Sequence, residues 1–183
     1  MKLRLLFVLF LASLSSFAQY TQIPDAYFEA ELIRQGIDSG TPDGKVLTSK
    51  INTLTSLNVR GVGLIEDLTG IQDFTALKFL LCDSNRLTAL DVSKNTSLTY
   101  LSFGNNFLMT INVSKNIALT ELRCNHNQLT TLDVSRNTAL ATLHCYDNQL
   151  RVLDFSNNTA LTYLDCSANQ LIGLNLKNGN NSK

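Results

Sequence analysis

Arg123, His144 and Asp165 follow one another at intervals of 21 residues, and Ser167 comes two residues after Asp165. An imidazole beside a carboxylate can act as a general base, so this set raises the question of hydrolytic chemistry. Adjacent rungs of a parallel sheet also bring opposite charges together without any catalytic role. No strained nucleophile turn surrounds Ser167, and a shallow surface excludes little water. We therefore predict a charge ladder or a ligand contact here, and no enzyme.

Four cysteines share this spacing, namely Cys82, Cys124, Cys145 and Cys166, and Phe103 occupies the missing step. An even cysteine count in a secreted chain normally predicts disulfides. Equivalent positions on adjacent strands lie about 4.8 Å apart, whereas bridged Cβ atoms prefer about 3.8 Å. Four thiols in a straight column also cannot surround one tetrahedral zinc ion. We expect free, buried thiols and no metal site, with a Cys124–Cys145 or Cys145–Cys166 bridge as the alternative.

These residues belong to a 21-residue repeat that occurs five times between residues 74 and 178. Its pattern is L-x-x-L-x-C-x-x-N-x-L-x-x-L-D-V-S, with small substitutions. A fixed period of this length on L-x-x-L-x-L/C-x-x-N is the signature of leucine-rich repeats. Residues 51–73 match the opening of the pattern and form a divergent first coil, whose step to the next coil is 23 residues. The sequence predicts a leucine-rich-repeat solenoid of short parallel strands joined by turns.

Side chains alternate along each predicted strand, so leucine and cysteine point inward and the residues between them point to the concave face. The outward positions vary between coils while the framework barely changes. The predicted ligand-binding residues of this face are Phe79, Leu81, Tyr100, Glu121, Arg123, His144, Tyr146, Tyr163 and Asp165. Three of them, Phe79, Leu81 and Tyr100, would form an apolar patch that solubility alone disfavours. The alternative is that unconstrained surface positions simply drift.

Asparagine recurs at a second fixed position, in the order Asn85, Asn106, Asn127, Asn148 and Asn169. Backbone groups lose their ladder partners where the chain bends out of the strand, and a buried amide can both donate to them and accept from them. We therefore predict a structural asparagine ladder. Asn-x-Ser/Thr patterns at Asn95, Asn112, Asn157 and Asn180 are interpreted as turn residues.

The N-terminus has the features of a secretory signal peptide over residues 1–18. Lys2 and Arg4 precede an apolar run over residues 5–14, and a small-x-small cleavage pattern ends at Ala18. This run is too short to cross a bilayer, so no transmembrane segment is predicted. Cleavage reduces the 15 basic residues to 13, against 15 acidic ones, and leaves no block of like charge. Such a surface makes nucleic acid a poor partner.

Residues 19–50 do not fit the repeat and are predicted to form a helical cap on the first coil. The helix is expected over residues 24–35, with Pro24 and Asp25 in its first turn. Its charged face would be Glu29, Glu31 and Arg34. Solenoids need such terminal units because the first coil would otherwise expose its interior. The following stretch, residues 38–44, has some features of a calcium loop but lacks the closing glutamate, so we interpret it as a turn.

The segment L-I-E-D-L-T-G-I-Q-D-F-T-A-L, residues 64–77, resembles the internalin type of bacterial leucine-rich repeat. The 21-residue coils with cysteine resemble the cysteine-ladder internalins, and residues 23–38 are similar to the start of secreted Bacteroidetes repeat proteins. This resemblance implies a secreted or surface-attached recognition or adhesion protein without a cofactor. Its ligand would be a protein or, second, a surface glycan. A passive spacer that positions another domain is the alternative function.

The last repeat is followed by a short polar tail over residues 179–183 rather than by an amphipathic closing unit. Solenoids normally carry one. From this we expect either a truncated or uncapped end, or pairing of the last coil with a second copy of the chain.

Overall fold

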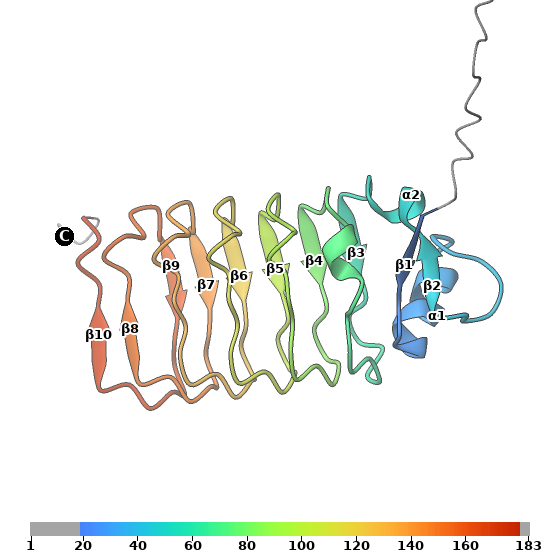
Figure 1. The fold of residues 1–183 in the computed structure, drawn as a ribbon. Helices are drawn as coiled ribbons and strands as arrows, with labels where there is room; N and C mark the ends of the chain where they lie inside the picture. Colours follow the sequence, from blue (N-terminus) through green and yellow to red (C-terminus); the bar gives the residue numbers. More distant parts are fainter. Residues whose placement is uncertain (1–18, 180–183) are drawn as a thin grey trace, which may run out of the picture.

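The computed structural model describes residues 19–179, and these residues form a stack of coils with a small helical unit at the N-terminal end (Figure 1). The architecture is the predicted leucine-rich-repeat solenoid. The predicted signal peptide at residues 1–18 and residues 180–183 of the predicted tail lie outside the described residues.

One parallel sheet of six strands runs along the stack. Its strands, in spatial order, are β3 (Ser56–Asn58), β4 (Phe79–Leu81), β5 (Tyr100–Ser102), β6 (Glu121–Arg123), β7 (Thr142–His144) and β9 (Tyr163–Asp165). Paired residues from β4 onward are 21 positions apart, as in Phe79 opposite Tyr100, whereas Ser56 lies opposite Phe79 at 23. The repeat length therefore fixes the register of the sheet, and a side chain meets its equivalent in the next coil.

The middle residue of each strand points into the solenoid. Leu80, Leu101, Leu122 and Leu143 are fully buried there, and each contributes about 1.5–3 kcal/mol through burial. Cys82, Cys124 and Cys145 are buried two residues further on, and Phe103 replaces cysteine in the second regular coil. The sulfur atoms are not bonded to one another, and Cys166 is the only half-buried thiol among the described residues. Burial raises the pKa of the Cys145 thiol to about 12.

Each regular coil bends out of its strand at an asparagine that joins it to the preceding coil. The Asn127 side chain donates from Nδ2 to the carbonyls of Phe103 and Cys124, at 3.1 and 3.2 Å. Its Oδ1 accepts from the amide of Leu108 at 3.0 Å. The same arrangement recurs at Asn85, Asn106, Asn148 and Asn169. One side chain thus satisfies backbone groups in two coils at once.

A second column of asparagines, which was not predicted to be structural, recurs ten positions after the first and also joins adjacent coils. It comprises Asn95, Asn116, Asn137 and Asn158, all at most 1% exposed. Asn95 Nδ2 donates to the carbonyls of Ile71 and Phe74 at 2.8 and 3.0 Å. The Oδ1 atoms of these four residues accept no hydrogen bond within the described part of the chain. The interpretation of Asn95 as a plain turn residue is therefore wrong, because its amide is buried and ties two coils together.

The cap helix α1 (Ala26–Arg34) is shorter than predicted and begins after Asp25, which caps it from outside. Asp25 Oδ1 accepts from the amides of Tyr27 and Phe28, so this residue is not part of the first turn. Its Oδ2 accepts from the amide of Glu66 at 2.7 Å and ties the cap to the first coil. The Phe28 ring packs on the Phe74 ring with centroids 6.3 Å apart. The helix therefore closes the end of the core, as predicted.

Two acidic residues of the cap helix are buried, which contradicts the predicted charged face. Glu29 is 1% exposed and accepts from the amides of Asp43 and Gly44, each at 2.8 Å. Glu31 is 8% exposed and pairs with Arg34 at 2.6 Å, and this hydrogen bond lowers the pKa of Glu31. The turn at residues 38–44 is thus held by a helix carboxylate, because its amides needed an acceptor.

Several short elements were not predicted. They are the antiparallel pair β1 (Tyr20–Gln22) and β2 (Lys45–Leu47), α2 (Thr48–Ile51), the 3-10 helix η1 (Ile71–Asp73), and the parallel pair β8 (Val152–Asp154) and β10 (Gly173–Asn175). The first pair belongs to the cap, and the second lies at the far end of the solenoid (Figure 1). None of the described helices is long and apolar enough to cross a membrane.

The last described coil exposes apolar side chains. Ile172 is 76% exposed and Leu174 is 45% exposed, and β9 is an edge strand of the six-stranded sheet. Pairing of two copies through this coil stays a prediction.

Replacing Asn127 by alanine should lower the free energy of unfolding by about 1–3 kcal/mol, because the amide of Leu108 and the carbonyl of Phe103 lose their partner. Chemical denaturation measures this change. The matched control is Asn157→Ala, an exposed asparagine, which should stay within about 0.5 kcal/mol of the wild type. Equal midpoints for the wild type and Asn127→Ala would contradict the ladder's role.

Thiol titration of protein unfolded without reductant should detect all four cysteines. In the folded protein at pH 8, alkylation should reach Cys166 first, because the other thiols are buried and burial raises the pKa of Cys82, Cys124 and Cys145 further from the assay pH. Fewer than four free thiols after unfolding would show a bridge and refute the geometry of the column.

Candidate functional site

The outward side chains of the six strands, with the residue two positions beyond each strand, form three columns that we call the sheet face. All the predicted ligand-binding residues lie on it. Phe79, Tyr100, Glu121 and Tyr163 are in the first column, Leu81, Arg123, His144 and Asp165 in the second, and Tyr146 in the third. The columns form because side chains alternate between inward and outward along every strand, and neighbouring strands pair in the same register.

An aromatic cluster marks the N-terminal part of the sheet face. The rings of Phe79 and Tyr100 lie on adjacent strands with centroids 6.4 Å apart. Phe79 is 45% exposed, and Leu81 beside it is half-buried. Exposed apolar side chains that touch one another in this way are typical of interaction surfaces.

Arg123 is held in place at the centre of the sheet face. Its Nε donates to Glu121 Oε1 at 2.6 Å, and the guanidinium lies 5.9 Å from the centre of the Tyr100 ring. The hydrogen bond to Glu121 raises the pKa of Arg123. The terminal amino groups of the guanidinium remain as donors, since Glu121 engages only Nε.

The constellation that suggested hydrolytic chemistry is not assembled as a relay. His144 and Asp165 are opposite one another in the sheet, but the His144 ring packs on Tyr163 with centroids 4.8 Å apart. Ser167 Oγ donates to Asp165 Oδ1 at 2.7 Å, and this bond lowers the pKa of Asp165. Within residues 19–179 no hydrogen bond joins His144 to Asp165 or Ser167. His144 is instead positioned by its contact with the Tyr163 ring.

A shallow hollow of about 420 Å³ lies over the central strands of the sheet face and the residues that follow them. We call it the central hollow, and its lining includes Arg60, Leu81, Asp83, Tyr100, Arg123, His144 and Tyr146. Its volume is within the range of ligand sites in proteins. The lining combines cationic, aromatic and hydrogen-bonding groups on a rigid sheet.

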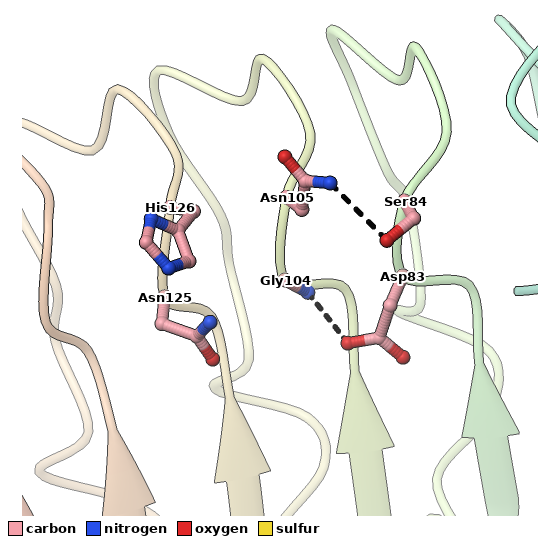
Figure 2. A pocket seen from close by; sticks show the side chains of 6 residues that line it. All are labelled: Asp83, Ser84, Gly104, Asn105, Asn125 and His126. Atoms are coloured by element: carbon pink, nitrogen blue, oxygen red, sulfur yellow. Dashed lines mark hydrogen bonds between the residues drawn. The ribbon is translucent and has the colours of Figure 1, made fainter. Parts of the chain in front are cut away.

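A second hollow of about 400 Å³ adjoins it and is centred on Gly104 (Figure 2). A Cβ atom at Gly104 would lie 3.1 Å from Asp83 Oδ1 and equally close to both amide atoms of Asn125. Without that Cβ, Asp83 Oδ1 accepts from the Gly104 amide at 2.9 Å and from Ser102 Oγ at 2.5 Å. The absence of a side chain at Gly104 leaves the hollow open and leaves room for the Asp83 carboxylate to point toward β5.

Sequence reasoning missed Arg60, which stands in the third column one rung before Asp83. The 23-residue step of the first coil hid this equivalence, although the amide of Gly61 donates to the Asp83 carbonyl in the same ladder. It also left His126 and Asp147 outside the predicted site. Their side chains pair at 2.5 Å on the rim of the face. Counting rungs from Asn58 instead of from the repeat motif would have found Arg60.

No described group of three or more histidine, cysteine, aspartate or glutamate side chains is arranged to hold a metal ion. The described sheet face carries hydrogen-bonding, charged and aromatic side chains.

No protein-family model matches this sequence, and no curated protein matches it. Solved structures do. The internalin InlF of Listeria monocytogenes is 26% identical over 81% of this chain and 45% of its own, with a TM-score of 0.73. A leucine-rich-repeat protein of Leptospira interrogans is 28% identical over 58% of this chain and 29% of its own, with a TM-score of 0.55.

The LRIM1/APL1C complex gives a TM-score of 0.64 at 22% identity, over 70% of this chain and 26% of that one, which is a likeness of fold alone. This chain spans less than half the length of each matched structure. The register of the sheet, the repeating coil and these likenesses together lead to one conclusion: the chain has an internalin-like leucine-rich-repeat fold.

Proposed function

We propose that this chain is a secreted or cell-surface recognition module that binds a protein through the sheet face. One observation carries the proposal. Inward positions keep leucine, cysteine and asparagine from coil to coil, while the outward positions of the same strands carry phenylalanine, tyrosine, arginine, histidine and aspartate. A scaffold that keeps its inward residues constant while its outward residues vary is suited to a surface whose residues contact a partner.

The chemistry of the sheet face supports a protein ligand over a glycan. Tyrosine, phenylalanine and arginine are the residue types enriched at protein interfaces, and they dominate the energy of such contacts. The apolar contact between Phe79 and Tyr100 adjoins the charged and polar lining of the central hollow. An apolar centre beside polar groups resembles the arrangement of an interface core and its rim.

The proposed location rests on the sequence of residues 1–18, which has the charged, apolar and small-residue regions of a signal peptide. The likeness to the internalin InlF is compatible with it. A more specific form of this proposal is that the recognised protein lies on a cell surface, so that binding leads to adhesion. The competing hypothesis is a passive spacer, in which the sheet face binds nothing and its variation is drift.

Changing Tyr100 and Tyr146 together to alanine should weaken binding of the native partner at least about tenfold, because buried aromatic anchors carry most of an interface's energy. The measurement is affinity capture from the natural surroundings of the protein, followed by titration of the captured partner. Tyr27→Ala is the matched control, since Tyr27 is 52% exposed on the cap helix, away from the sheet face.

A partner that binds the double variant with unchanged affinity would show that the sheet face is not the binding surface. If no partner binds the wild type under conditions where the folded protein is intact, the spacer hypothesis is favoured instead.

A further inference from the structure

The central hollow contains a cation whose charge the fold leaves unpaired. Arg60 lines the hollow, and its guanidinium forms no ion pair with any residue of the described chain. Arginine keeps its charge at every physiological pH and presents five donors in a planar fork. Such a group on a binding surface has most of its hydrogen-bonding capacity available to a ligand.

The carboxylate that would neutralise Arg60 is turned away from it. Asp83 is the next residue in the same column, one rung further along the sheet. Its Oδ1 accepts from Ser102 Oγ at 2.5 Å and from the amide of Gly104 at 2.9 Å, both on β5 or just beyond it. Gly104 leaves room for this orientation, because a Cβ there would lie 3.1 Å from the same oxygen, a tighter contact than is usual. The Asp83 carboxylate is thus directed toward β5 and Gly104, and it does not pair with Arg60.

Arg123 supplies a second cation to the same hollow. Glu121 engages its Nε and Tyr100 lies under its guanidinium, so the side chain is positioned before any ligand arrives. Preorganised donors lose less entropy on binding than free ones. Two guanidinium groups, the ring of His144 and the hydrogen-bonded carboxylate of Asp83 line the hollow, and Glu121 beside it pairs with Arg123, so Arg60 is the lining cation without an ion pair among the described residues.

We propose that Arg60 binds the carboxylate of an aspartate or glutamate side chain of the partner protein at the central hollow, which Arg123 also lines. This inference rests on the proposed function. Arginine binds a carboxylate through two parallel hydrogen bonds, which gives orientation as well as energy. The walls formed by Leu81, Tyr100 and Tyr146 receive the apolar part of the acidic residue and its neighbours. A protein supplies both parts together, an acidic side chain beside apolar ones.

The test is selection of a random dodecapeptide library on the folded protein, followed by a double-mutant cycle on the tightest acidic peptide. Selected peptides should be enriched in aspartate or glutamate next to an aromatic residue. Arg60→Gln should weaken that peptide about fivefold, and Glu→Gln in the peptide should weaken its binding to the wild type by a similar factor. The two changes combined should weaken binding little more than either alone, because they remove the same contact.

Asp83→Asn gives a result in the opposite direction. The asparagine Oδ1 can still accept from Ser102 and Gly104, but the negative charge beside the hollow is lost. The acidic peptide should therefore bind about two- to threefold more tightly, an increase that a misfolded variant cannot produce. Arg136→Gln, an exposed arginine outside the hollow, is the matched control and should change nothing.

Three results would overturn the subsite. The first is a selection whose peptides are not enriched in aspartate or glutamate, or that yields no peptide. The second is a double-mutant cycle in which the fold-losses in affinity from Arg60→Gln and from the peptide change multiply, and the third is weaker binding of the acidic peptide by Asp83→Asn. The proposed function fails separately. A native partner that needs Tyr100 and Tyr146 but binds Arg60→Gln with full affinity would keep the recognition module and reject the carboxylate subsite.

Discussion

The structure depends on the asparagine that ends each strand. The chain must turn sharply there, and the residue just before the asparagine has a positive φ although it is not glycine: Ser84, Asn105, His126, Asp147 and Ala168 have φ between 50° and 56°. A left-handed residue with a Cβ costs about 1–2 kcal/mol. The hydrogen bonds of the asparagine to three or four backbone groups offset this cost, as at Asn127. Because of these hydrogen bonds, the backbone groups at the bend do not need water as a partner.

This constraint explains how the sheet face can vary. Because an inward side chain holds the bend, the turn does not depend on the outward residues, and Tyr100, Glu121 and Thr142 can follow one another along a single column. The same separation gives Gly104 its effect. The missing side chain at Gly104 leaves room for Asp83 Oδ1 to accept from the Gly104 amide, since a Cβ there would lie 3.1 Å from that oxygen and from the side-chain amide of Asn125. Outward residues can therefore differ from coil to coil while the buried leucine and asparagine positions stay the same.

The sequence was sufficient for the repeating strands and for the asparagines that end them, although not for the second asparagine column. The spacing of Leu80, Leu101 and Leu122 predicted the sheet, its register and the inward column, because a period of 21 residues permits only one alignment of the coils. It was insufficient where the chain departs from the repeat. Glu29 and Glu31 follow a helical pattern that usually means exposure, and only the tertiary structure shows that loop amides and Arg34 satisfy them.

The candidate site divides in the same way. Phe79, Arg123 and His144 were placed on one face by alternation alone. Arg60 was not, since the 23-residue step shifts it out of the motif, and neither was the orientation of Asp83 toward the Gly104 amide, which is a tertiary contact between adjacent coils. The buried amides of Asn95 and Asn116 were also missed, because an asparagine followed by threonine or isoleucine in a turn has no local feature that indicates burial.

Hydroxyl-radical footprinting of the protein with and without its captured partner tests the central claim, that the sheet face is the recognition surface. The account predicts protection of Phe79, Tyr100, Tyr146 and Tyr163, and unchanged labelling of Tyr20 and Tyr27 on the cap and of Phe107 off the sheet, all three of which are about half exposed. Protection confined to the cap or to Phe107, with the aromatic residues of the sheet face still labelled, would contradict it.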